Sequence, residues 1–186
     1  MGKPTDLMGK RSDYVRKPRD YYPTPLAAVV PLIAHLPSSF TFAEPCAGDG
    51  RLIKHIHALA PGSECSFASD IEPRENDEDI EECDAFDITE AQLAHTDIII
   101  TNPPWERKIL HPLIEQFSDL RPTWLLFDAD WIHTIQSSSL VQSRLCKIVC
   151  IGRVKWIEDS AGSGKDNASW YLFDAKKAGP TEFYGR

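Results

Sequence analysis

The feature that most constrains the fold is an uninterrupted apolar run, Ile98–Ile100, between Asp97 and Thr101. A strand that is apolar at every position is buried on both faces, which is typical of a central strand in a parallel sheet covered by helices. The run leads directly into Asn102-Pro103-Pro104-Trp105. The two prolines fix φ and remove two backbone donors, so the chain cannot continue as a helix there. The motif is therefore expected at the mouth of a buried strand.

The rest of the chain alternates short apolar segments with segments of helical periodicity. This alternation predicts a doubly wound α/β sheet that is mostly parallel. The last two of seven expected strands have no helix between them and are expected to pair as an antiparallel hairpin. We predict strands at Phe40–Glu44, Ser66–Ser69, Ile80–Cys83, Thr96–Thr101, Trp124–Asp128, Lys147–Ile151 and Trp170–Phe173, and helices at Pro25–Leu36, Arg51–Leu59, Thr89–His95, Ile109–Leu120 and Ser137–Leu145.

A glycine-rich turn follows the first expected strand, in the segment Thr41–Gly50. Gly48 and Gly50 permit positive φ and a close approach of backbone to a ligand, and the helix that follows directs its N-terminus at that ligand. The turn lacks the Gly-x-Gly-x-x-Gly spacing of the dinucleotide-binding fingerprint. Asp70 ends the second strand, where a carboxylate can accept hydrogen bonds from two ribose hydroxyls; the alternative is an ordinary turn residue.

The Asn-Pro-Pro-Trp motif has the groups needed to activate an amino nitrogen on a planar ring. The lone pair of such a nitrogen is delocalised, and two acceptors, the Asn102 amide oxygen and the Pro103 carbonyl, would favour a pyramidal nitrogen with its lone pair free. Trp105 would stack on the ring and hold it in place. The alternative is a strand-to-helix turn that contains Pro103 and Pro104 without any catalytic role.

Together, the Glu-Pro-x-x-Gly-x-Gly turn and the Asn-Pro-Pro-Trp motif resemble the S-adenosylmethionine-dependent amino-methyltransferases, and among them the N6-adenine DNA methyltransferases. The segment Tyr21–Pro25 resembles the one that closes over the methionine end of the cofactor in those enzymes, and Gly152–Tyr171 resembles small phage and prophage members. The resemblance spans about Asp20 to Asp174. It implies a class I methyltransferase sheet, Rossmann-like and seven-stranded, and S-adenosyl-L-methionine as cofactor.

The resemblance also implies roles for individual residues. Asp84 would accept from the adenine amino group of the cofactor, although the family often has Asp-Phe where this chain has Asp84-Ala85-Phe86. The expected catalytic residues are Asn102, Pro103, Pro104 and Trp105. The expected cofactor-binding residues are Tyr22, Thr24, Glu44, Cys46, Ala47, Gly48, Gly50, Asp70, Ile71, Asp84, Ala85 and Asn102.

The substrate side is expected to involve Trp105 and the segment between the last two strands. Trp156 is the candidate for a second aromatic wall, or else a hydrophobic plug over the sheet. Trp131 either lines the same cleft or belongs to the core. Three further residues, Lys155, Lys165 and Asn167, are expected to meet phosphate or sugar.

The expected function is methyl transfer to N6 of adenine in DNA, with the base flipped out of a duplex or presented in a single strand. Because only about 20 N-terminal residues and Val154–Ala168 are spare, we expect short or relaxed sequence specificity. Three alternatives stay open. An N4-cytosine or RNA N6-adenine methyltransferase would use much the same site, a protein glutamine methyltransferase would accept an amide nitrogen, and a binding module would have kept the fold without catalysis.

Charge and composition define the remaining expectations. The net charge of −8 is unusual for a nucleic-acid-binding protein. Residues 1–19 form a basic arm that either contacts DNA or only aids solubility, and residues 20–186 are expected to form one catalytic domain. Five cysteines without a Cys-x-x-Cys pair argue against disulfides and zinc, and we expect no metal. Cys46 is expected to pack rather than to react. With no membrane span or signal sequence, we expect a cytoplasmic protein; the oligomeric state is not readable.

Overall fold

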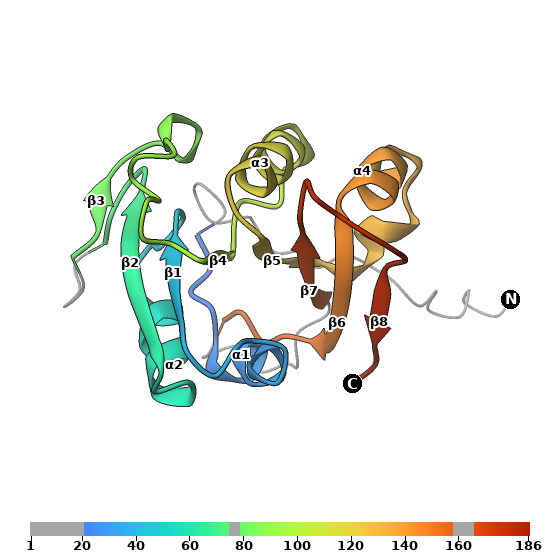
Figure 1. Cartoon of the computed structure of the whole chain (residues 1–186). Coiled ribbons are helices and arrows are strands. Elements are labelled where there is room, and N and C mark those ends of the chain that lie inside the picture. The colour runs from blue at the N-terminus through green and yellow to red at the C-terminus, as the bar shows by residue number, and fades with distance from the viewer. Residues whose placement is uncertain (1–20, 75–78, 158–165) are drawn as a thin grey trace, which may run out of the picture.

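A computed structural model describes residues 21–74, 79–157 and 166–186. Its strands form one sheet with helices on both faces (Figure 1). The predicted basic arm at residues 1–19 lies outside the described residues. The elements are α1 (Leu26–Ile33), β1 (Phe40–Glu44), α2 (Arg51–Leu59), β2 (Ser63–Asp70), β3 (Glu81–Glu82), β4 (Ile98–Thr101), α3 (Arg107–Leu120), β5 (Thr123–Asp128), α4 (Ser138–Ser143), β6 (Leu145–Arg153), β7 (Asn167–Phe173) and β8 (Glu182–Tyr184).

The order of the strands in the sheet is β3-β2-β1-β4-β5-β7-β6-β8. From β1 the chain builds outward through β2 and β3, and it then returns to add β4 and β5 on the other side of β1, with all these strands parallel. The strand β7 is antiparallel to both β5 and β6. The predicted doubly wound sheet with its C-terminal hairpin is therefore confirmed. The topological switch point, where α/β sheets bind ligands, lies between β1 and β4.

Hydrophobic side chains form one core on each face of the sheet. Ile98 and Ile100 of β4 pack with apolar residues of α1 and α2, whereas Ile99 packs with residues of α3 and α4. Figure 1 shows these two pairs of helices on opposite faces. All four residues of β4 are buried. The uninterrupted apolar run thus fills both cores, as its sequence predicts.

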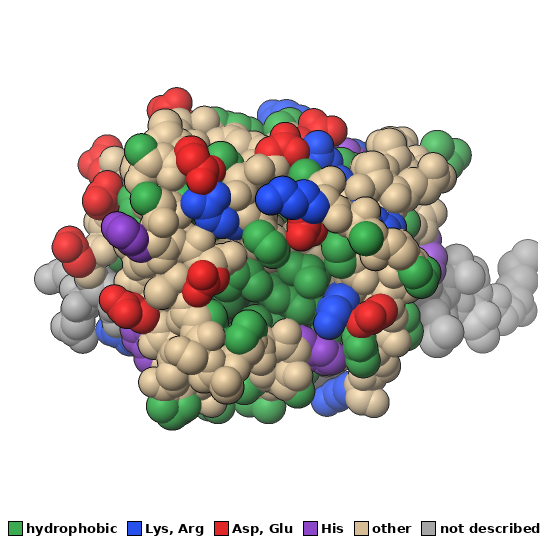
Figure 2. Space-filling view, in the orientation of Figure 1, with side chains coloured by type: hydrophobic (Ala, Val, Ile, Leu, Met, Phe, Trp, Pro, Cys, Tyr) green, Lys and Arg blue, Asp and Glu red, His purple; other side chains and the backbone are tan. Residues whose placement is uncertain are grey.

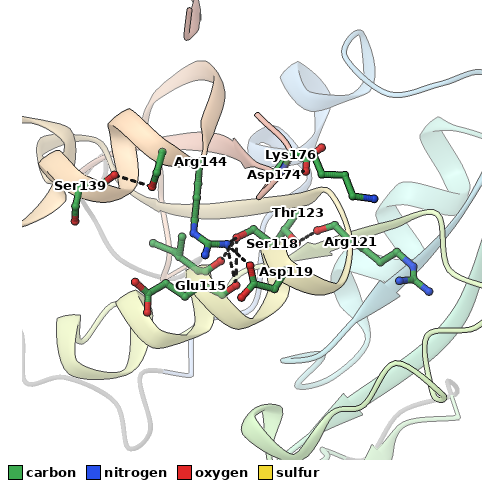
Figure 3. A network of polar contacts seen from close by, with 11 residues as sticks. Glu115, Ser118, Asp119, Arg121, Thr123, Ser139, Arg144, Asp174 and Lys176 are labelled. Carbon is green, nitrogen blue, oxygen red and sulfur yellow. Dashed lines mark hydrogen bonds and ion pairs between the residues drawn. The ribbon is translucent and has the colours of Figure 1, made fainter. Parts of the chain in front are cut away.

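Polar contacts join the end of α3 to the segment between α4 and β6. The Arg144 guanidinium donates to the Asp119 carboxylate at 2.6 Å, to the Ser118 hydroxyl at 2.9 Å and to the Glu115 carbonyl at 3.3 Å (Figure 3). A cation near the C-terminal end of a helix complements the helix dipole. Arg144 therefore fixes the C-terminal end of α3 against the start of β6.

The structure differs from the sequence prediction in two places. Thr89–His95 is a set of turns and not a helix, with bonds from Ala94 N to Ala91 O and from Thr96 N to Leu93 O. The Gln92 side chain accepts from both the backbone and the hydroxyl of Thr89, as in the capping box that begins a helix, but only turns follow it. The second difference is an eighth strand, β8, which pairs parallel to β6 at the sheet edge.

Acidic side chains gather at the edge of the sheet opposite to β8. Figure 2 shows them along the left-hand side of the molecule, over β2 and β3. Their exposed members include Glu72, Glu81, Glu82, Asp87 and Glu90. No helix within the described ranges has the length and apolar character needed to cross a membrane.

Candidate active site

Polar residues follow four neighbouring strands at one edge of the sheet. Glu44 ends β1, Asp70 ends β2, Asp84 lies two residues beyond β3, and Asn102 comes directly after β4. These strands are adjacent in the order β3-β2-β1-β4 and parallel, so their carboxyl ends meet at the same edge. This is the edge where open α/β sheets bind ligands. The topology therefore brings together the two motifs that the sequence separates by about 50 residues.

The glycine-rich turn is held by Asp70. Gly48 and Gly50 have φ values of 57° and 69°, and Gly50 is the N-terminal cap of α2. Asp70 Oδ2 accepts from the Gly48 N–H at 2.8 Å, and Asp70 Oδ1 accepts from the Glu72 N–H at 2.9 Å. A carboxylate has about four lone-pair sites, so acceptor capacity remains for a ligand's hydroxyls. The sequence did not predict this second, structural role of Asp70.

Tyr21 covers the glycine turn from above. A Cβ atom on Gly48 would lie 2.8 Å from Tyr21 Cε2, so a side chain at this position would collide with the ring. The Arg74 guanidinium lies 4.6 Å from the centre of the Tyr21 ring, and the Arg74 N–H donates to the Gly48 carbonyl at 2.9 Å. Burial, together with the neighbouring Asp49 carboxylate, raises the pKa of Tyr21 to about 12. Tyr21 belongs to the predicted closing segment, but it was not among the predicted site residues.

The carboxamide of Asn102 is fixed at both ends. Its Nδ2 donates to the Tyr22 carbonyl and to the Thr24 hydroxyl, both at 3.2 Å, and its Oδ1 accepts from Trp105 Nε1 at 3.2 Å. A backbone carbonyl can only accept and an indole nitrogen can only donate. These two partners leave a single orientation for the amide, in which the nitrogen faces the closing segment and the oxygen faces Trp105. The oxygen retains a second lone pair.

Three aromatic rings, Tyr22, Trp105 and Trp156, form a cluster that includes the hydrogen-bond partner of the Asn102 oxygen. Trp105 meets Trp156 edge to face, with ring centres 5.4 Å apart and planes at 85°, and Tyr22 lies 6.5 Å from Trp156. Trp105 is half-buried, packs against both cores and also donates to the Leu126 carbonyl at 3.2 Å. Trp156 Nε1 is buried and has no hydrogen-bond partner in the described part of the chain. An unpaired buried donor is costly, which is consistent with a site that a ligand's acceptor completes.

The residues on the β2–β3 side fit the adenosine part of S-adenosylmethionine. Ile71 and Phe86 are apolar yet 50% and 43% exposed, and each lies beside a predicted cofactor-binding carboxylate, Asp70 or Asp84. An exposed apolar pair next to acceptors suits a flat, amino-bearing ring. Asp84 Oδ1 accepts from the Phe86 N–H at 3.0 Å, which fixes the carboxylate.

The floor of the site is formed by the turn after β1. Glu44 is only 2% exposed, and Pro45 and Ala47 are buried beside it. Loss of solvation, reinforced by the Asp70 carboxylate, raises the pKa of the half-buried Cys46 thiol. A thiol with a raised pKa stays protonated and is a poor nucleophile. The environment of Cys46 therefore favours packing over covalent chemistry.

The remaining predicted substrate residues fall on or near the β6–β7 hairpin. Lys155 and Asn167 are exposed, and Asn167 pairs with Arg153 at the end of the hairpin where the connecting segment joins the two strands. Lys165 lies outside the described residues. Trp131, for which two interpretations were open, is a core residue that donates to His111 Nε2 at 2.9 Å and packs against Phe127. The described residues contain no cluster of three His, Cys, Asp or Glu side chains that could hold a metal ion.

Solved structures of methyltransferases share this fold. A protein from Pyrococcus horikoshii assigned as an RNA methyltransferase aligns with a TM-score of 0.59 at 13% identity, over 84% of this chain and 87% of its own. The methyltransferase subunit of a type I restriction-modification system from Streptococcus thermophilus aligns with a TM-score of 0.57 at 12% identity. The M protein of the type I restriction enzyme EcoKI aligns with a TM-score of 0.54 at 9% identity.

Each alignment to these two type I proteins covers 89% of this chain, but only 46% and 48% of the longer proteins. No protein-family profile and no curated protein matches the sequence. At these identities the likeness establishes the fold alone: the chain has the Rossmann-like fold of class I S-adenosylmethionine-dependent methyltransferases.

Proposed function

We propose that the protein transfers a methyl group from S-adenosylmethionine to the exocyclic amino nitrogen of a nucleobase, with N6 of adenine in DNA as the favoured substrate. The observation that carries this proposal is the orientation of the Asn102 carboxamide. Its oxygen, and not its nitrogen, faces the indole N–H of Trp105, whose ring in turn meets Trp156 edge to face. An oriented acceptor beside flat rings matches a planar substrate that carries an N–H group.

In this mechanism the protein activates a weak nucleophile by hydrogen bonding. S-adenosylmethionine supplies an electrophilic methyl group on a positively charged sulfur. Asn102 Oδ1 and the Pro103 carbonyl accept the two amino hydrogens, which favours a pyramidal nitrogen with its lone pair directed at the methyl carbon. The nitrogen would gain the methyl group as the carbon–sulfur bond breaks, S-adenosylhomocysteine would leave as the neutral thioether, and the amino nitrogen would release one proton to solvent. Preorganised acceptors and positioning account for the rate, and no general base is assigned.

The burial of the motif determines how a base can reach it. Pro103 is buried and Asn102, Pro104 and Trp105 are only partly exposed. A base stacked inside a duplex cannot approach such acceptors, so the substrate is a flipped base or a single strand. Trp105 would contact one face of the base, since aromatic rings stack on bases of any identity. Trp156 lies perpendicular to Trp105 and packs against the hydrophobic core, so it would contact the edge of the base. Lys155 and Asn167, exposed at the end of the hairpin, would meet the backbone.

The test is nucleoside mass spectrometry after incubation of the protein and S-adenosylmethionine with duplex DNA, single-stranded DNA or RNA. We expect N6-methyladenine in DNA, and no product from an Asn102→Ala variant that still binds the cofactor. Methylcytosine or modified RNA would retain the mechanism and change the substrate. Absence of any nucleoside product would overturn the proposal and direct attention to peptide amides or to a binding role.

A further inference from the structure

The segment Tyr21–Thr24 contacts both motifs of the site. At one end, Tyr21 covers Gly48 and stacks with Arg74. At the other end, the Tyr22 carbonyl and the Thr24 hydroxyl accept the two hydrogen bonds of Asn102 Nδ2. The sequence separates Thr24 from Asn102 by 78 residues. The segment therefore connects the cofactor-binding turn to the residue that would face the substrate.

We propose that Thr24 is a positioning residue: its hydroxyl holds the carboxamide of Asn102 with the oxygen toward the substrate. This inference rests on the proposed function, and it assigns Thr24 a role toward Asn102 in place of the expected contact with the cofactor. Thr24 is only 4% exposed, and its hydroxyl lies 3.2 Å from Asn102 Nδ2. A buried hydroxyl in such a contact is held in place by its surroundings, so it can transmit its position to the amide.

The need for a second acceptor follows from the geometry of a primary amide. Asn102 Nδ2 carries two hydrogens, and the Tyr22 carbonyl and the Thr24 hydroxyl each take one. Without the hydroxyl, one buried hydrogen would lack its partner, and the carboxamide would be held only by the Tyr22 carbonyl and the Trp105 N–H. These two bonds keep the amide in the same orientation but fix its plane less tightly. An oxygen displaced from its position would accept a poorer hydrogen bond from the amino group of the substrate, which would lower kcat.

The test compares Thr24→Val, which removes the hydroxyl at nearly constant volume, with Thr24→Ser, which keeps it. For the valine variant we expect kcat to fall about tenfold, the usual effect of losing one hydrogen bond. The KM and calorimetric affinity for S-adenosylmethionine should stay within about twofold of the unmodified protein. The serine variant should recover most of kcat. A valine variant that loses cofactor affinity while kcat is retained would assign Thr24 to the cofactor instead.

A second measurement does not depend on activity. The side-chain NH₂ signals of Asn102, identified by their loss in Asn102→Ala, report its hydrogen bonding in ¹⁵N-labelled protein. We expect faster exchange of these hydrogens with solvent in Thr24→Val and unchanged exchange in Thr24→Ser. Identical signals in all three proteins would overturn the inference. If the unmodified protein methylates no substrate, the proposed function fails, and these signals still decide whether Thr24 positions Asn102.

Discussion

The indole N–H of Trp105 is shared between Asn102 Oδ1 and the Leu126 carbonyl, each 3.2 Å from Nε1. One partner belongs to the proposed catalytic motif and the other to β5, the neighbouring strand. The ring is therefore fixed to the sheet, and the Asn102 oxygen is fixed to the ring. Because that oxygen has two lone pairs, it can serve Trp105 and a substrate amino group together.

Two replacements of Trp105 should distinguish the contribution of its hydrogen bond from that of its aromatic surface. Trp105→Phe removes the N–H but keeps an aromatic surface, so we expect a loss of about 1 kcal/mol in the free energy of unfolding and, because the Asn102 oxygen loses its partner, a fall in kcat of about tenfold. Trp105→Ala also removes the surface for stacking, which is worth about 1–3 kcal/mol per base. Its kcat/KM for a single-stranded oligonucleotide should therefore fall by a further factor of about 10 to 100. Equal activity of the two variants would exclude stacking by Trp105.

Asp70→Ala should weaken cofactor binding more than it affects transfer at saturation. The Asp70 carboxylate accepts a hydrogen bond from the Gly48 N–H at 2.8 Å, and it is the candidate acceptor for the ribose hydroxyls of the cofactor. Hydrogen bonds to a charged group contribute about 1.5–3 kcal/mol, so calorimetry should show an affinity for S-adenosylmethionine lowered by at least about tenfold. Asp87→Ala, an exposed carboxylate on the same side, is the matched control. Similar affinities for both variants would remove Asp70 from the site.

Gly48→Ala should disturb both the glycine-rich turn and the Tyr21 ring that covers it. The glycine has a φ of 57°, which side chains rarely adopt, and a Cβ would lie 2.8 Å from Tyr21 Cε2. We expect about 1 kcal/mol of destabilisation from the backbone alone and a displaced Tyr21. Calorimetry should show weaker cofactor binding, and urea unfolding should show the loss of stability. In Gly185→Ala, where a Cβ meets nothing within 4 Å, neither quantity should change.

The sequence predicted the central part of the fold because its signals there are local. The apolar run of β4 could only fill a buried strand, and the strands with helices between them could only wind in a few ways. The signals fail where tertiary contacts decide. Thr89–His95 forms only turns although Gln92 accepts from the Thr89 N–H as it would at the start of a helix, and the residues of β8 are all exposed, so burial imposes no alternating pattern on that strand.

For the site, the sequence could place residues at one edge of the sheet but could not assign their contacts. The strand ends placed Asp70 and Asn102 together because parallel strands share an edge. The bonds from Asp70 to Gly48 and from Asn102 to Thr24 depend on how loops cross that edge. Trp131 could likewise not be assigned from the sequence. It lies in the core, where its indole N–H donates to His111, a residue of a different element.

Asp97 should make the stability of the sheet depend on pH in the acid range. Its Oδ2 accepts from the backbone N–H of Thr41 at 2.8 Å and from the Thr41 hydroxyl at 3.0 Å, which ties the start of β4 to β1. These hydrogen bonds lower the pKa of Asp97 in the folded state. A lowered pKa means that the stabilisation is present above the unfolded value of about 3.9 and is lost as the pH falls through the folded value.

Asp97→Asn should therefore be less stable than the unmodified protein at neutral pH, and the difference should shrink below about pH 4. Urea unfolding followed from pH 7 to pH 2.5 measures both proteins. Asp87→Asn, an exposed carboxylate outside this contact, serves as the control and should track the unmodified protein. A difference between Asp97→Asn and the unmodified protein that stays constant to the lowest pH would show that the charge of Asp97 contributes nothing. The bonds to Thr41 would then act through geometry alone, since an asparagine oxygen can still accept one of them.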